Sequence, residues 1–288
     1  MSLVLTLLLD GLAYGMILFI ISVGLTVTMG LMRIVNLAHG VFAMIGGFVA
    51  AMLTGAGVHF FLAALGGAAA AAVAGGLAEV TVYRPLYRKG ELAQVLLTIG
   101  LVFVSIAAVT LAFGTNYTTV GVPAFLTEPV DLGFRFYPAY RLFLIAVGLA
   151  LAVGLWLLID RTLFGARLRA AVDNPRIAQA VGIDVRRLFT LTFVGGSALA
   201  GLGGALGAEM MTLEAAYPLR YLVTFLIVVI VGGEGSFKGS FVAAIALGII
   251  DTAGKYFIPE VSSFLLYAAV IVLLLARPRG LLPPKAVA

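Results

Sequence analysis

Cysteine is absent from this chain of 288 residues, which excludes disulfide bonds and thiolate chemistry. Charged residues are scarce: they make up 11% of the sequence, whereas apolar residues make up 62%. A soluble domain carries about 25% charged residues, because its surface must face water. The composition therefore excludes a soluble domain and indicates a protein that crosses a membrane several times.

The apolar residues form long continuous runs rather than alternating with polar ones, and this pattern favours helices over a β-barrel. A helix needs about 20 residues to cross the hydrocarbon core of a bilayer. We therefore predict an all-α integral membrane protein, a polytopic bundle of about 8–10 transmembrane helices, some of them broken or re-entrant. The expected crossings lie near residues 3–30, 40–54, 60–82, 93–113, 139–159, 188–212, 219–232, 240–257 and 261–276.

The organisation and the orientation of the chain follow from its polar segments. Because no soluble segment exceeds about thirty residues, residues 1–288 are predicted to form one transmembrane domain. Basic residues cluster in residues 83–91, in residues 160–187 and in the tail after residue 276. Cytoplasmic loops are enriched in Lys and Arg, so the net charge of +5 does not indicate nucleic acid binding. We expect these three segments and the C-terminus in the cytoplasm, and the N-terminus in the periplasm.

A polar break, MRIVNLAHGVFAMIGG, interrupts the apolar pattern at residues 32–47. A helix that ends at Asn36 and begins again near Gly40 leaves backbone groups unpaired where water is absent. Asn36 and His39 have side chains that can pair with them. The break is therefore either a structural cap or, since polar residues inside a membrane are costly, the lining of a permeation path. No metal site is expected at His39, because no carboxylate or cysteine has ligand spacing to it.

A second glycine-bearing break, VGGEGSFKGSFVAA at residues 231–244, resembles residues 36–50. Each break precedes a short helix rich in small residues. Transporters often build their pathway from paired broken helices in their two halves. The two breaks therefore suggest an internal repeat.

The connecting loop of residues 161–187 predicts two short amphipathic helices. Pro175 restarts the helix after a first apolar face, and Gly182 is well placed to end the second helix. The first apolar face holds Leu163, Phe164, Leu168, Ala171 and Val172, and the second holds Ile177, Ala180 and Val181. Helices of this kind either lie on anionic lipid or dock into a groove of a partner protein.

Four carboxylates fall within or near the expected crossings, namely Glu79, Glu209, Glu214 and Asp251. We expect Glu79 and Glu214 at the ends of crossings, where the cost of a charge fades, and Glu209 and Asp251 facing a cavity. An ion-coupled secondary transporter would use such groups and is an alternative. A membrane-embedded enzyme is disfavoured, because the crossings show no metal constellation and no nucleophile–base pair.

Three motifs in this order resemble the permeases of branched-chain amino acid ABC transporters. They are NLAHG at residues 36–40, RAAVDNPRIAQAVGIDVRRLFTLTF at residues 169–193 and VGGEGSFKGSFVAAIALG at residues 231–248. The resemblance spans nearly the whole chain, and the length of 288 residues suits the shorter of the two permease types of that system. It implies a subunit that moves branched-chain or other hydrophobic amino acids across the bacterial inner membrane by ATP-driven alternating access. Urea, short amides and aromatic acids are alternative substrates within the same family.

The resemblance also implies partners and site residues. A second permease, two cytoplasmic ATP-binding subunits and a periplasmic substrate-binding protein would complete the importer. ATP and magnesium would bind to the partner subunits, so this chain would hold no cofactor and would not be an enzyme. The substrate pathway would contain Asn36, Ala38, His39, Gly40, Gly232, Gly233, Gly235 and Ser236, to which the intramembrane charge adds Glu209. The coupling helix, which docks into an ATPase groove, would contain Asn174, Pro175, Arg176, Ala178, Gln179, Gly182 and Ile183.

Overall fold

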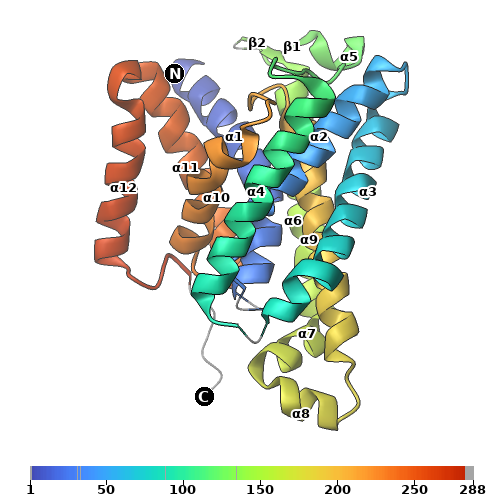
Figure 1. Cartoon of the computed structure of the whole chain (residues 1–288). Helices are drawn as coiled ribbons and strands as arrows, with labels where there is room; N and C mark the ends of the chain where they lie inside the picture. Colours follow the sequence, from blue (N-terminus) through green and yellow to red (C-terminus); the bar gives the residue numbers. More distant parts are fainter. Residues whose placement is uncertain (1, 31, 33, 88, 134, 283–288) are drawn as a thin grey trace.

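The computed structural model describes residues 2–282 except residues 31, 33, 88 and 134. Within this part of the chain, long apolar helices run back and forth as a bundle (Figure 1). Six of them are long and apolar enough to cross a membrane, and α2, α10 and α12 are shorter. The expected all-α membrane fold is confirmed. The bundle helices are α1 (Ser2–Gly30), α2 (His39–Gly55), α3 (Phe60–Ala78), α4 (Glu91–Phe113), α6 (Ala139–Arg161), α9 (Val185–Gly207), α10 (Tyr217–Gly232), α11 (Phe237–Phe257) and α12 (Ser262–Ala276).

Shorter elements mark the two ends of the bundle. The hairpin of β1 and β2 lies at one end with α5, and α7 and α8 lie at the other; we call these the hairpin end and the α8 end (Figure 1). The described parts of the three basic segments lie at the α8 end (Figure 1). The shorter elements are η1 (Glu79–Tyr83, a π-helical turn), η2 (Arg84–Leu86), α5 (Ala124–Thr127), β1 (Pro129–Asp131), β2 (Phe136–Pro138), α7 (Leu163–Asp173), α8 (Pro175–Ala180) and η3 (Pro259–Val261).

Small residues bring the inner helices into backbone contact. In the most apolar stretches of α1 and α9, 56% of the residues are buried, compared with 17% in α4 and 11% in α6. Gly46 of α2 lies against α9, where a Cβ atom on Gly46 would be 2.2 Å from the carbonyl oxygen of Gly201. Glycine at such positions permits the close helix contacts on which membrane bundles depend. The inner core therefore rests on α1, α2, α3, α9 and α11, and the outer helices α4 and α6 are largely exposed.

The first break begins where the expected crossing of residues 3–30 ends, and so before Asn36, where the polar motif placed the end of the helix. Helix α1 ends at Gly30 rather than at Asn36, and α2 begins at His39. Gly30 packs against Gly235, just beyond the end of α10, whereas Gly40 packs against Pro218 at the start of α10. These two ends of α10 are about 20 Å apart at 1.5 Å per helical residue. The non-helical segment therefore re-enters the bundle beside α10, which explains why α2 is short.

Candidate functional site

The first break is held by hydrogen bonds from three neighbouring elements. The Nε2–H group of His39 donates to the carbonyl oxygen of Ile21 in α1, at 2.8 Å. The Tyr83 hydroxyl of η1 donates to Oδ1 of Asn36 at 2.7 Å. The backbone N–H of Val35 donates to Oε1 of Gln94 in α4 at 3.0 Å. The break is thus fixed at Asn36 and at His39.

The polar side chains of the first break are buried in this conformation. Asn36 is 0% exposed and His39 is 2% exposed, and Ala38 and Gly40 are buried beside them. Neither side chain caps a helix end as the cap interpretation expected, because α2 begins without a side-chain cap and both bonds join the break to neighbouring elements. Among the described residues, however, Nδ2 of Asn36 has no hydrogen-bond acceptor. A buried donor without a partner costs about 1–3 kcal/mol. The bond of Asn36 to Tyr83 does not explain this cost, and a role of Asn36 in a pathway stays a prediction.

Replacing His39 with leucine is expected to lower the melting temperature of the protein in detergent. The substitution removes the only hydrogen bond that ties the start of α2 to Ile21 in the described structure, which costs about 1–3 kcal/mol at a buried site. Thermal unfolding of the purified variant measures this loss, and the His39→Gln variant, which keeps a donor, serves as the control. Unchanged melting together with lost uptake would assign His39 to the pathway instead.

The second break is a tight turn between two antiparallel helices, at the α8 end. Gly233 and Gly235 have φ angles of 98° and 77°, a left-handed conformation that favours glycine. Oγ of Ser236 accepts a hydrogen bond from the N–H of Gly239 at 3.1 Å and so caps α11. The two breaks are similar in sequence but differ in position: among the described residues, the first break lies inside the bundle and the second lies at its α8 end. The two breaks meet at one point, where a Cβ atom on Gly30 would be 1.9 Å from the nitrogen of Gly235.

The two carboxylates expected to face a cavity have different positions. The prediction that Glu209 lies inside a crossing is wrong, because α9 ends at Gly207 and Glu209 is exposed in the following turn. The backbone N–H groups of Met210 and Met211 both turn back to the carbonyl oxygen of Gly207, which ends the helix there. Asp251 does line a cavity, and its carboxylate pairs with Lys255 of the next helical turn at 2.6 Å.

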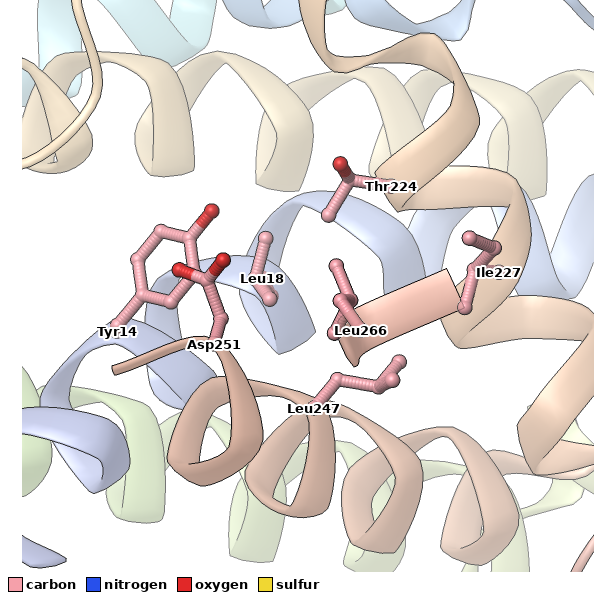
Figure 2. A pocket seen from close by; sticks show the side chains of 7 residues that line it. All are labelled: Tyr14, Leu18, Thr224, Ile227, Leu247, Asp251 and Leu266. Atoms are coloured by element: carbon pink, nitrogen blue, oxygen red, sulfur yellow. The ribbon is translucent and has the colours of Figure 1, made fainter. Parts of the chain in front are cut away.

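The cavity at Asp251 lies among four helices, α1, α10, α11 and α12 (Figure 2). Its volume is about 20 Å³, room for about one water molecule. The ammonium group of Lys255 lies 5.3 Å from the centre of the Tyr14 ring, a cation–π contact beside the ion pair. In this conformation the cavity is too small for an amino acid. Its walls are formed by Tyr14, Leu18, Thr224, Ile227, Leu247, Asp251 and Leu266.

The loop between α6 and α9 folds as its sequence predicts. Oδ1 of Asn174 accepts hydrogen bonds from the N–H groups of Arg176 and Ile177, both at 3.1 Å, and Pro175 is the first residue of α8. Gly182, with a φ angle of 85°, ends the turn after α8. The two predicted amphipathic helices and their boundaries are confirmed.

Residues of α8 point in two directions. Ala178 is 2% exposed and packs inside the loop, so it is not available to a partner, contrary to its place in the predicted docking set. Ile183 is half-buried beside it, whereas Asn174, Pro175, Arg176, Gln179 and Gly182 are exposed. Ile177 and Val181 are 62% and 70% exposed and form an apolar face that the docking set lacks, although the sequence stripe contains both. The loop has its own small core of Leu168, Ala171, Ala178, Val185 and Leu188.

A buried ion pair that the sequence did not indicate lies where α3 meets the start of α9. Glu79, expected at a crossing end with little cost, is 0% exposed. Its carboxylate accepts hydrogen bonds from Arg84 at 2.7 Å, from Tyr87 at 2.7 Å and from Thr190 at 2.8 Å. Burial, and then the bond to Glu79, raises the pKa of Tyr87, so its hydroxyl stays a donor. The sequence could not indicate this cluster. Thr190 lies 111 residues after Glu79, and a π-helical turn rather than a regular helix brings Arg84 and Tyr87 to the carboxylate.

These features together define a polytopic membrane permease: a bundle of crossing helices with an interior break, and a two-helix loop that projects from one end. The chain belongs to the family described as branched-chain amino acid transport system / permease component, which matches residues 7–275. The family expected from the three sequence motifs is confirmed. It is a family of transport permeases rather than enzymes.

Curated relatives match over most of their length. The chain is 26% identical over 278 residues to the probable branched-chain amino acid transport permease protein LivH of Methanocaldococcus jannaschii, covering 94% of this chain and 88% of the relative. It is 26% identical over 291 residues to the high-affinity branched-chain amino acid transport system permease protein LivH of Escherichia coli, covering 95% and 93%. It is also 27% identical over 290 residues to the corresponding protein LivM of Escherichia coli, covering 93% and 68%.

Proposed function

We propose that this chain is the permease subunit of an ABC importer that moves branched-chain or other hydrophobic amino acids across the bacterial inner membrane. The names of the relatives support the substrate class. The observation that carries the proposal is the apolar face of α8, where Ile177 and Val181 are exposed at the end of the bundle that collects the basic residues. A transport subunit that hydrolyses no ATP itself needs such a face to receive movement from an ATPase.

The position of α8 favours protein docking over lipid binding. Figure 1 shows α8 as the part of the loop farthest from the membrane-crossing helices. A helix that lies on lipid would rest beside the ends of those helices, at the membrane surface. The loop instead packs on the first turns of α9 through its small core, with α8 at the far end of the loop (Figure 1). We therefore assign α8 to a groove on an ATP-binding subunit.

Orientation and partners follow from this assignment. Lys and Arg prefer cytoplasmic loops, so the α8 end faces the cytoplasm and α1 begins on the periplasmic side. Similarity to both LivH and LivM of Escherichia coli supports a pair of similar permeases. Two ATP-binding subunits, which hold ATP and magnesium, and a periplasmic substrate-binding protein complete the assembly. Closure of the ATP-binding subunits would move α7 and α8, and the two permeases would open their shared pathway to the other side.

Purification of the tagged chain from its native membrane in mild detergent tests the proposal. We expect a second permease and two ATP-binding proteins to co-purify, and we expect ATP-dependent leucine uptake when the complex and its binding protein are placed in liposomes. A chain that purifies alone and catalyses ion-dependent flux without ATP would contradict the proposal.

Neutralising the two candidate ion sites, by Asp251→Asn and Glu209→Gln, is expected to leave ATP-driven uptake nearly unchanged. Glu209 is exposed, and Asn at position 251 keeps the size of the buried aspartate and an oxygen that can accept from the exposed Lys255, so uptake should stay within about twofold, or about 0.4 kcal/mol. Initial uptake rates in liposomes measure the effect. Loss of uptake together with loss of its dependence on a sodium or proton gradient would favour the ion-coupled alternative.

A further inference from the structure

The α7–α8 loop and the start of α9 form one packed unit. Val185 and Leu188 of α9 belong to the small core of the loop. Phe189 contacts this core and also the main core of the bundle, where its ring lies 6.3 Å from the ring of Tyr87 in an edge-to-face arrangement. A displacement of the loop therefore displaces the first turns of α9, because closely packed side chains move together.

The next residue of α9 is bonded to the buried carboxylate of Glu79. The Thr190 hydroxyl lies 2.8 Å from Oε2 of Glu79, and Nη2 of Arg84 donates to the oxygen of Thr190 at 2.9 Å. Arg84 also donates to both carboxylate oxygens of Glu79, at 2.7 and 3.2 Å. A charge that is fully buried is costly once its donors leave, so this cluster holds α9 and η1 together.

The same π-helical turn holds the first break. Tyr83 is four residues after Glu79 in η1, and its ring packs against Phe193 of α9, with 4.8 Å between the ring centres. Its hydroxyl donates to Asn36 at 2.7 Å. Contacts therefore run without interruption from the loop, through Phe189 and Thr190, to Glu79 and Tyr83, and end at Asn36 inside the break. Single π-helical turns within helices are frequent at functional sites.

We infer that Glu79 and its donors transmit movement of the α7–α8 loop to the first break, with Glu79 and Tyr83 as positioning residues. This inference rests on the proposed function, because the movement comes from ATP-binding partners. Thr190 provides a second arrangement, since its single hydroxyl proton has two acceptors: Glu79 at 2.8 Å and the carbonyl oxygen of Arg186 in its own helix at 3.0 Å. Rotation of α9 can exchange one bond for the other without leaving the hydroxyl unpaired.

Two conservative variants and two matched controls test the inference in the complete transporter. Tyr83→Phe removes the bond to Asn36, and Thr190→Val removes the bond to Glu79. The control Tyr140→Phe also removes one buried tyrosine bond, to the carbonyl oxygen of Leu206 at the hairpin end. The control Thr192→Val removes a buried α9 hydroxyl that has no partner among the described residues. We expect the ratio of substrate imported to ATP hydrolysed to fall about five- to tenfold in the two variants, a typical size for coupling between sites, and to stay at the wild-type value in the controls.

Hydrogen exchange at the break gives a second readout that does not depend on transport. Thr190→Val should speed exchange of the Val35 amide, and it should add little once Tyr83→Phe is present, because both bonds act in one chain. Equal import-to-hydrolysis ratios in variants and controls, or fully additive exchange effects, would overturn the inference. Absence of ATP-driven uptake by the wild-type complex would overturn the proposed function instead, and the exchange data would still decide whether the loop side and the break are coupled.

Discussion

Replacing both Ile177 and Val181 with glutamate is expected to abolish ATP-driven uptake while the permease stays folded. Ile177 in α8 and Val181 directly after it are exposed and take no part in the small core of the loop, so the folded state loses little packing. At the centre of a docked interface, each buried apolar anchor contributes about 2 kcal/mol or more. Loss of both anchors would weaken docking by about a thousandfold, since about 1.4 kcal/mol corresponds to a factor of ten.

Co-purification and uptake measure the effect of this double variant. We expect the ATP-binding subunits to be lost in detergent, where no bilayer is present, and the melting temperature of the permease to be unchanged. Leu163→Glu is the matched control, because Leu163 is equally exposed but lies at the start of α7, next to the membrane-crossing helix α6. If the loop served to bind lipid, the control would impair uptake as well, and the ATP-binding subunits would co-purify with every variant.

The sequence predicts well those features that depend on neighbouring residues. The crossings follow from the lengths of the apolar runs, since a bilayer demands about 20 apolar residues from each helix. In the loop, Asn174, Pro175 and Gly182 determine where α8 begins and ends, because a cap, a fixed φ angle and a left-handed residue act within one helical turn. For the same reason the amino-acid pattern alone locates both amphipathic helices of the loop.

The sequence did not predict the features that depend on residues distant in the chain. The inward direction of Ala178 is set by contacts with α7 and α9, so the apolar stripe beside it turned out to face outward. The burial of Glu79 requires Thr190, more than a hundred residues later in the chain. Helix α1 ends at Gly30, where the first expected crossing ends, but the contact of Gly30 with Gly235 is one that no local pattern reveals. The polar character of the first break was predictable, but its path beside α10 was not.

Replacing Gly46 with alanine is expected to prevent the bundle from assembling. A Cβ atom at this position would lie 2.2 Å from the carbonyl oxygen of Gly201 and 2.3 Å from its Cα atom, so backbone rather than a flexible side chain blocks it. Overpacking in a tight core costs about 1–3 kcal/mol and more where the backbone must move, which exceeds the gain of about 1 kcal/mol in helix propensity from glycine to alanine. Separation of α2 from α9 would also disturb the close packing of Gly46 on Gly67 of α3.

The yield of monodisperse protein in detergent and its melting temperature measure this effect, and Gly55→Ala is the matched control. Gly55 belongs to the same helix, and a Cβ atom there would meet nothing within 4 Å. The control should therefore melt at the wild-type temperature or above it. Equal melting of the two variants would mean that α2 and α9 tolerate separation. The close contact of α2 with α9 would then not be what holds the first break inside the bundle.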